Sequence, residues 1–237
     1  MMRVFILAAG LGTRIRAQYP DIPKCLIPVR GKPFLLWQMR YLMDQGFKDF
    51  VLCVGYRKEQ VMEYFKDGSE FGASVEYSTE DEPQGTGSTL GTARKFFSDT
   101  SLVLNGDTYL PVDYRKLVES HRHSAAQGGA LVTMALFPTP DFRSSGRVVL
   151  GADGRISEFI EKKKEWEKGD LANAGAYVLE SSVMELIPQT GPCSLEHDVF
   201  PSLAERGLLR GVRVERGFID MGSPQGLAEL EAFLSHE

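Results

Sequence analysis

The sequence predicts an α/β protein with a mostly parallel sheet that helices cover on both faces. In the first half of the chain, short apolar runs of strand length alternate with segments whose apolar residues recur at helical spacing. Strands joined in this way by helices pair in parallel. A chain of 237 residues with 43% hydrophobic content can bury one large core, so we expect a single domain over residues 1–237.

The elements expected in the first half are strands at 4–9, 50–54, 73–77 and 101–104, and helices at 34–45, 57–65 and 89–97. In parallel sheets, ligands collect beyond the carboxyl ends of the strands. The loops that follow the strands at 4–9 and 101–104 both lie at such ends. They are therefore the expected site.

Antiparallel strands are expected in the second half, which makes the sheet mixed. We expect a helix at 113–124, strands at 130–137, 147–150, 155–160 and 173–179, a short helix at 181–187, and a last helix capped by Ser223. The Ala-Asp-Gly turn at 152–154 favours a hairpin between its two flanking strands.

Composition excludes several classes of function. A formal net charge of −5 argues against general nucleic-acid binding, which needs a basic face. No apolar run reaches the roughly 18 residues that span a bilayer, and the N-terminus lacks the sections of a signal peptide. We therefore expect a cytoplasmic protein without a membrane partner. Three unclustered cysteines suggest neither a disulfide framework nor a zinc site, and the four histidines, which lack metal-ligand spacing, are expected at the surface.

The loop after the first strand has the composition of a phosphate-binding loop. Gly10 and Gly12 lack the Cβ atoms that would hold a ligand away, so backbone N–H groups can converge on phosphate oxygens. Thr13 adds a hydroxyl donor, Arg14 adds a fixed charge, and Lys24 adds a mobile cation a short loop away.

Two known glycine-rich loops do not match this one. The Walker pattern ends in Gly-Lys-Ser/Thr, which is absent here. The dinucleotide fingerprint needs a third glycine, where this chain has Ile15, and an acidic residue about twenty positions further on. A nicotinamide dehydrogenase is therefore excluded.

The remaining pattern is Ala-Ala-Gly-x-Gly-Thr-Arg from Ala8, followed by Pro23-Lys24, and it resembles the sugar-1-phosphate nucleotidyltransferases, or NDP-sugar pyrophosphorylases. Further motifs in the family's order extend the resemblance over nearly the whole chain. The resemblance implies a three-layer, Rossmann-like α/β fold with a mixed, mostly parallel central sheet. It also implies a nucleotide-binding half at 1–110 and a sugar-binding half at 111–237. Within the family, the similarity is greatest to guanylyltransferases that act on D-glycero-D-manno-heptose 1-phosphate or mannose-1-phosphate.

The resemblance also implies a metal site. Asn105-Gly106-Asp107 is similar to the family's metal motif, and Phe218-Ile219-Asp220-x-Gly222 is similar to the segment with the second carboxylate. Mg²⁺, or Mn²⁺ in its place, would take Asp107 and Asp220 together with phosphate and water oxygens. The alternatives are a turn residue for Asp107 and an acid beside a helix for Asp220.

Residues 80–87 precede a helix and resemble the family's base-reading loop. Gly85 would let the backbone approach the base, and Glu80 would accept hydrogen bonds from it. A carboxylate suits guanine, whose N1–H and N2–H₂ both donate, whereas the carbonyls of uracil or thymine would repel it. Ser88-Thr89 departs from the usual Gly-Ala, and uridylyl-transferring relatives carry similar acidic runs. Uridylyl or thymidylyl transfer therefore stays an alternative to the use of GTP.

The site residues that the resemblance implies fall into two sets. Those for the nucleotide are Leu7, Ala8, Ala9, Gly10, Gly12, Thr13, Arg14, Lys24, Glu80, Gly85, Thr86 and Asp107. Those for the sugar phosphate are Asn105, Gly146, Glu161, Lys162 and Asn173. Ser194-Leu195-Glu196 also matches the subgroup for mannose- and heptose-type sugars.

The implied reaction is that of a nucleoside triphosphate with a sugar-1-phosphate, giving an NDP-sugar and pyrophosphate. The sugar phosphate is already an ionised nucleophile, so alignment and charge stabilisation by Arg14, Lys24 and Asp107 are the expected catalysis. A catalytically inactive, sugar-nucleotide-binding regulatory subunit is one alternative, but we would expect it to lack one of these residues. An alcohol-phosphate cytidylyltransferase of the same fold is another, and it would lack the Glu161-Lys162 pair. The identity of the sugar and the oligomeric state are left open.

Overall fold

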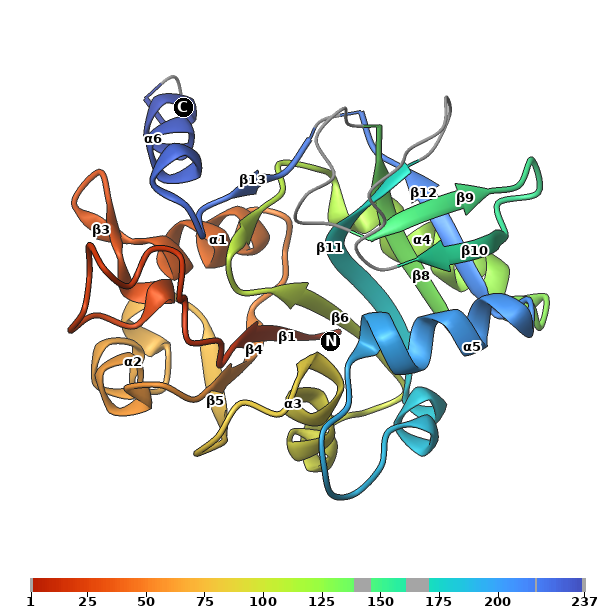
Figure 1. Ribbon diagram of the computed structural model, residues 1–237, viewed down its shortest axis with the longest axis horizontal. Helices are drawn as coiled ribbons and strands as arrows, with labels where there is room; N and C mark the ends of the chain where they lie inside the picture. The colour runs from red at the N-terminus through yellow and green to blue at the C-terminus, as the bar shows by residue number, and fades with distance from the viewer. Residues whose placement is uncertain (1, 139–145, 161–170, 216, 236–237) are drawn as a thin grey trace.

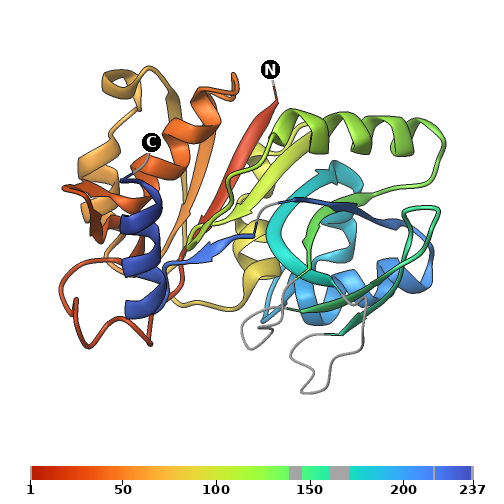
Figure 2. The same ribbon diagram turned by 90° about the horizontal axis from the view of Figure 1, so that it is seen from above.

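The computed structural model describes residues 2–138, 146–160, 171–215 and 217–235, and shows a central sheet between two layers of helices (Figures 1 and 2). The elements of the first half are β1 (Arg3–Ala8), η1 (Lys24–Leu26), β2 (Pro28–Val29), β3 (Lys32–Pro33), α1 (Phe34–Met43), β4 (Asp49–Val54), α2 (Lys58–Phe65), η2 (Ser69–Phe71), β5 (Ser74–Thr79), α3 (Thr86–Thr92), η3 (Arg94–Phe96), β6 (Thr100–Asn105) and β7 (Thr108–Tyr109). Those of the second half are α4 (Tyr114–Ala126), β8 (Val132–Phe137), β9 (Arg147–Leu150), β10 (Ile156–Ile160), β11 (Leu171–Glu180), η4 (Ser181–Leu186), η5 (Leu195–Val199), α5 (Phe200–Glu205), β12 (Leu209–Arg213), β13 (Ile219–Asp220) and α6 (Pro224–Phe233).

The expected mixed sheet is confirmed. Strands β5, β4, β1 and β6 are parallel neighbours, as the alternation of strands and helices predicts. Strand β11 joins β6 in the antiparallel direction and also pairs with β8 and β9, while β10 forms the expected hairpin with β9. The carboxyl ends of β1 and β6 therefore meet at one edge of the sheet.

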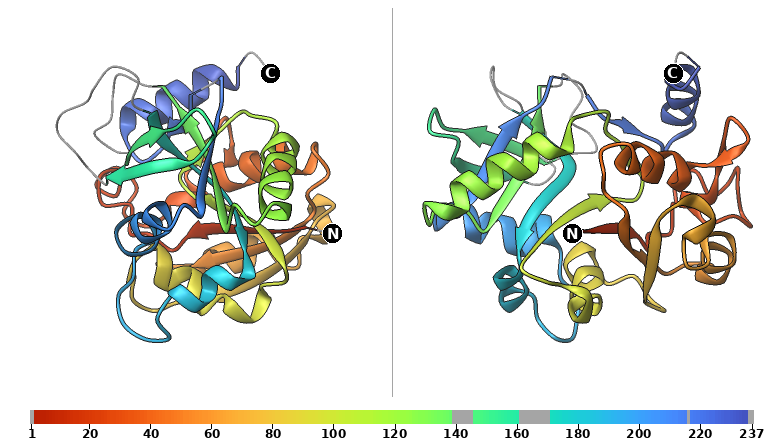
Figure 3. Two further views of the ribbon diagram at one scale, coloured as in Figure 1. Left: turned by 90° about the vertical axis from the view of Figure 1, so that its right-hand side faces the viewer. Right: turned by 180° about the vertical axis from the view of Figure 1, so that it is seen from behind.

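Strand β1 shows why the sheet is covered on both faces. Phe5 points into a core that α3, η4 and α5 close, whereas Val4 and Ile6 point into a core that α1, α2 and α4 close. All three side chains are fully buried. Figure 3 shows α4 along β8 and β12, which it contacts. The three-layer α/β architecture is thus confirmed.

The C-terminal segment returns to the N-terminal half of the molecule. Strand β13 pairs with β7, and α6 lies beside the β2–β3 hairpin (Figure 1). Leu227 and Leu230 of α6 pack with Ile27 and Val29 in a third hydrophobic cluster. The predicted cap is confirmed, because the Ser223 hydroxyl accepts from the Gly226 N–H at 3.1 Å.

Several elements were not predicted. They include α5, β12, the β2–β3 hairpin and the short strands β7 and β13. The helix predicted at 89–97 begins earlier, at Thr86, and its last turn is the separate 3₁₀ helix η3.

The surface expectation is wrong for His121, which is fully buried. Its Nδ1 lies 2.9 Å from Thr133 Oγ1 and its Nε2 lies 2.9 Å from Glu180 Oε1. Desolvation lowers the pKa of His121. The hydrogen bond and the charge of Glu180 raise this pKa and offset part of the shift, whereas the positive charge of Arg122 lowers it further.

The three cysteines are free and buried. Burial raises the pKa of Cys25 to about 12, so this thiol stays protonated near neutral pH. Within the described residues, no helix has the length and apolarity that a membrane crossing requires.

Candidate active site

The glycines at the ends of β1 and β6 let the two following loops pack together. The Gly106 N–H donates to the Leu7 carbonyl at 2.9 Å, and a Cβ on Gly106 would lie 2.8 Å from the Ala8 Cβ. Gly12 has a positive φ of 60° and lies over the aliphatic part of the Lys24 side chain. A Cβ added to Gly12 would lie 3.1 Å from the Lys24 Cβ. The close approach of Gly12 brings the first loop onto Lys24.

The pairing of β7 with β13 brings the two predicted metal ligands together. Asp220 stands opposite Thr108, and the Met221 N–H donates to the Asp107 carbonyl at 3.1 Å. The Asp220 Oδ1 accepts from the Gly222 N–H at 2.8 Å, which fixes this carboxylate before α6 begins. Two segments more than 100 positions apart in the sequence thus present their carboxylates side by side.

Four predicted charged residues form one cluster at this edge of the sheet. Lys24 Nζ lies 2.6 Å from Asp107 Oδ2 and 3.9 Å from Asp220 Oδ1, and Arg14 Nη2 lies 2.9 Å from Asp220 Oδ2. The exposed fraction of the side chain is 11% for Lys24, 20% for Asp220, 40% for Asp107 and 56% for Arg14. Lys24 is therefore held inside the site, while Arg14 reaches outward. Thr13, next to Arg14, is exposed on the same loop.

The cluster keeps Asp107 ionised. Desolvation opposes its charge, but the charge and hydrogen bond of Lys24, with help from Thr108 and Arg14, outweigh it and lower the pKa of Asp107. Among the described residues, no group of three or more His, Cys, Asp or Glu side chains could hold a metal by itself. Two carboxylates fit Mg²⁺ or Mn²⁺ that takes its other ligands from phosphates and water.

A cavity of about 230 Å³ extends from this cluster to the N-terminus of α3. Its lining residues are Leu7, Ala9, Gly10, Glu80, Pro83, Gly85, Thr86, Thr89, Asn105 and Asp107. All of them except Pro83 and Thr89 are predicted site residues. Because Asp107 belongs to both the lining and the charge cluster, a ligand in the cavity would reach the charged groups directly.

Glu80 lies in this cavity beside a residue that the sequence reading missed. The Thr89 hydroxyl lies 3.1 and 3.0 Å from the two carboxylate oxygens of Glu80 and 3.1 Å from the Gly85 carbonyl. Desolvation raises the pKa of Glu80, and the hydrogen bond from Thr89 offsets part of this rise. The departure from Gly-Ala at Ser88-Thr89 was the one signal in the sequence that pointed to this residue.

The loop that contains Gly85 is held by a segment of the second half. The Thr86 hydroxyl donates to Glu196 Oε2 at 2.5 Å and accepts from the Leu195 N–H at 3.0 Å. Gly85 has a φ of 105°, and a Cβ there would collide with the Cys193 carbonyl. The Ser-Leu-Glu motif thus supports the expected base-reading loop, and its Leu195 is buried in the core.

The predicted sugar-side residues within the described ranges lie on neighbouring strands. The Asn173 N–H donates to the Gly146 carbonyl at 3.0 Å, and the Asn173 side chain binds the Gly175 N–H at 3.0 Å and the Tyr177 hydroxyl at 2.7 Å. The Asn105 side chain lies against Gly175, whose φ is 71°. Glu161 and Lys162 lie outside the described residues, so their expected roles stay predictions.

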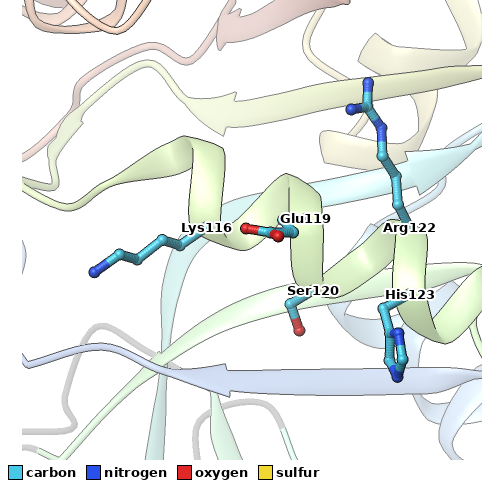
Figure 4. Close-up of a pocket in the computed structure, with 5 residues that line it drawn as sticks. All are labelled: Lys116, Glu119, Ser120, Arg122 and His123. Atoms are coloured by element: carbon cyan, nitrogen blue, oxygen red, sulfur yellow. The ribbon is translucent and has the colours of Figure 1, made fainter.

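A larger depression of about 630 Å³ lies on the outer surface of α4 (Figure 4). Its lining residues are Lys116, Glu119, Ser120, Arg122 and His123. Figure 4 shows these side chains pointing in different directions along one helix. They do not converge on a common point, so the cavity at the ends of β1 and β6 is the better candidate for the active site.

Comparison with known proteins identifies the family of this chain. The family model described as nucleotidyl transferase matches residues 3–237. The D-glycero-alpha-D-manno-heptose 1-phosphate guanylyltransferase of Aneurinibacillus thermoaerophilus is 33% identical, over 99% of each chain. The mannose-1-phosphate guanylyltransferase catalytic subunit beta of Drosophila pseudoobscura pseudoobscura is 34% identical over 94% of this chain.

This chain spans 60% of the length of the Drosophila protein. Among solved structures, HddC from Yersinia pseudotuberculosis complexed with GMP-PN superposes with a TM-score of 0.82 at 30% identity. That comparison covers 99% of this chain and 100% of the other. By sequence and by structure, the chain belongs to the nucleotidyl transferase family.

Proposed function

We propose that this protein transfers a guanylyl group from GTP to a heptose- or mannose-type sugar-1-phosphate, releasing pyrophosphate and forming a GDP-sugar. The observation that carries the proposal is the cluster of Arg14, Lys24, Asp107 and Asp220 at one end of a cavity with Glu80 in its wall. The cluster suits the chemistry at the phosphates, and the wall suits a base. The names of the heptose and mannose relatives support the choice of sugar and nucleotide.

The cations of this chain supply the charge stabilisation. Lys24 is 2.6 Å from Asp107 and mostly enclosed, so it is placed to meet the charge that develops on the α-phosphate. Arg14 is more exposed, which suits contact with the leaving pyrophosphate. The attacking sugar phosphate is already ionised, so no side chain needs to act as its general base.

Asp107 and Asp220 would hold the metal ion. Mg²⁺ bound there would neutralise phosphate charge and fix the nucleotide's orientation. The lowered pKa of Asp107 keeps the carboxylate available as a hard ligand well below neutral pH.

The choice of guanine rests on Glu80. Its pKa is raised by desolvation, so this half-buried carboxylate gains from donors that approach it. Guanine offers two adjacent donors, N1–H and N2–H₂, whereas uracil and thymine offer carbonyl oxygens at the flanking positions. Uridylyl or thymidylyl transfer is the alternative that a comparison of nucleotides decides.

We further propose that residues 1–110 bind the nucleotide and residues 111–237 bind the sugar. Asn173 of β11 binds the Gly146 carbonyl just before β9, and Gly175 of β11 lies against Asn105 at the end of β6, which supports a sugar site beside the charge cluster. Three residues cross the division, because Asn105 belongs to the sugar site, Asp220 joins the phosphate site and Glu196 supports the base loop.

The test is a pyrophosphate-release screen that crosses GTP, ATP, UTP, dTTP and CTP with an alcohol phosphate and with sugar-1-phosphates, including heptose- and mannose-1-phosphate. We expect release with GTP and one of these two sugars, and slower release with a higher Mg²⁺ requirement in the Asp107→Asn variant. Release that is at least tenfold faster with UTP, dTTP or CTP would overturn the choice of base. Nucleotide binding without release for any pair would favour the inactive regulatory subunit. Release with CTP and an alcohol phosphate would favour the cytidylyltransferase.

A further inference from the structure

Gln38 is a polar residue on the buried face of α1. Its exposed fraction is 2%, and Leu35, Met39 and Leu42 on the same helix are buried in the core. A glutamine at such a position loses its hydration on folding, so its hydrogen bonds must account for its presence.

The Gln38 amide binds both ends of the turn that carries Asp107. Its Nε2 donates to the Asn105 carbonyl at 2.9 Å and to the Thr108 carbonyl at 3.0 Å. Both partners are acceptors, so the NH₂ group must face them and the orientation of the amide is set. The two protons of one side chain thus join the residues that flank Gly106 and Asp107.

The oxygen of this amide differs from the NH₂ group. Among the described residues, Gln38 Oε1 has no hydrogen-bond partner although it is buried. A buried acceptor without a partner destabilises the folded state, and such atoms are rare in native proteins. The unpaired oxygen of Gln38 therefore lowers the stability of the fold. The two hydrogen bonds from its NH₂ group to the turn explain why a glutamine occupies this position.

We propose that Gln38 is a positioning residue that fixes the turn of Asp107 for nucleotidyl transfer. The inference rests on the proposed role of Asp107 in the reaction. The turn is held at two further points, by the Gly106 N–H on Leu7 and by the Met221 N–H on the Asp107 carbonyl. Gln38 supplies its contacts from α1, on the core side of the turn, where the neighbouring side chains are apolar. Without it, the two carbonyls that flank Asp107 lose their donors, and the carboxylate can shift relative to Lys24.

The same helix region offers a matched control. Gln45, just beyond the end of α1, also uses its amide on backbone groups: Nε2 donates to the Val112 carbonyl at 3.0 Å, and Oε1 accepts from the Tyr114 N–H at 2.7 Å. These contacts hold the start of α4 and involve none of the charged residues of the site. Replacing Gln45 should therefore affect stability without affecting the reaction.

The experiment compares Gln38→Met with Gln45→Met, since methionine fills a similar volume without an amide. In the pyrophosphate-release assay, we expect Gln38→Met to lower kcat by about 10- to 100-fold, the scale of effect that misplacement by about 1 Å can have. It should also raise the Mg²⁺ concentration that gives half-maximal rate. The KM of the sugar phosphate should stay within about threefold of wild type, because uniform binding of the substrate is not removed. Gln45→Met should lower Tm and keep kcat within twofold of wild type.

A second readout does not depend on activity. Amide hydrogen exchange of the peptide that contains residues 105–108 should be faster in Gln38→Met than in wild type, and unchanged in Gln45→Met. If both variants lose the same stability while Gln38→Met keeps the wild-type kcat and exchange rate, the proposal is wrong. If Gln38→Met does not fold, Gln38→Asn takes its place, because its shorter side chain cannot span both carbonyls. Failure of the wild-type enzyme to release pyrophosphate would count against the proposed function, and the exchange measurement would still decide whether Gln38 holds the turn.

Discussion

Replacement of Lys24 by methionine tests whether the enclosed cation of the site carries the reaction. Lys24 Nζ lies 2.6 Å from Asp107 and 3.9 Å from Asp220, and 11% of the side chain is exposed. Methionine keeps an unbranched apolar chain, so the packing of Gly12 against the stem is retained. Water has little access to the position, so it should replace the lost charge poorly.

The expected loss follows from this geometry. Removing one preorganised group that stabilises transition-state charge typically lowers kcat by 10²- to 10³-fold, which is about 2.7–4 kcal/mol. We expect Lys24→Met to fall in this range. Its stability should change little, because Asp107 is 40% exposed and an ion pair to such a group contributes roughly 0–1 kcal/mol.

The assay is steady-state pyrophosphate release at saturating substrates, with thermal unfolding as the check on folding. Lys58→Met is the matched control, because Lys58 Nζ lies 2.5 Å from Asp81, whose side chain is 92% exposed. This pair lies outside the charge cluster, so its loss should leave kcat within twofold of wild type. A folded Lys24→Met enzyme with kcat within threefold of wild type would refute the assignment of Lys24.

Three further predictions concern the metal, the base and a buried histidine. Asp107→Asn and Asp220→Asn should each raise the Mg²⁺ concentration needed for half-maximal rate, because amides are poorer ligands for hard cations; full activity in the presence of a chelator would contradict the metal site. Glu80→Gln should lower the preference for GTP over UTP by roughly 5- to 150-fold, as the loss of about 1–3 kcal/mol of discrimination implies, while Asp81→Asn should leave this ratio unchanged. The pKa of His121 lies below its ordinary value of 6.5, so the unfolded state takes up its proton first and the free energy of unfolding should fall as the pH drops below about 6.5. Urea unfolding at pH 7.5 and 5.5 should show a smaller loss in His121→Gln than in wild type, and equal losses would count against this linkage.

The local pattern of the sequence was enough for the parallel core and for the first loop. Strands β1, β4, β5 and β6 lie within about two residues of their predicted positions. Strands β1, β4 and β6 contain continuous apolar runs, and β5 has Val75 and Tyr77 at alternating positions. The glycine loop could be predicted because glycines directly after an apolar strand are a signal within one short stretch of sequence, and Gly12 has a positive φ of 60°. Both signals are properties of neighbouring residues.

The parts that sequence reading missed depend on contacts between distant segments. Strands β7 and β13 have two residues each, and their pairing joins positions 108–109 to 219–220. No periodicity can show in two residues. His121 lies on a helix that looks polar, and its burial depends on Thr133 and Glu180, which come from β8 and β11. Gln38 interrupts an apolar helix face, but its partners are backbone carbonyl groups. Every residue has such a group, so the sequence does not show which ones Gln38 binds.

The position of Asp220 shows how apolar packing far from the phosphates can set the geometry of a charged site. Strand β13 is too short to hold this carboxylate by its own ladder with β7. Directly after it, α6 buries Leu227, Leu230 and Leu234 against the cluster that includes Val29 of the β2–β3 hairpin. The Gly226 backbone comes so close to the Asp220 carbonyl that a Cβ there would collide with it. Burial of α6 therefore fixes the end of β13, and through it the separation of Asp220 from Lys24 and Arg14. The second carboxylate comes from the last 20 residues of the chain because the helix that follows it supplies the anchoring that a two-residue strand lacks.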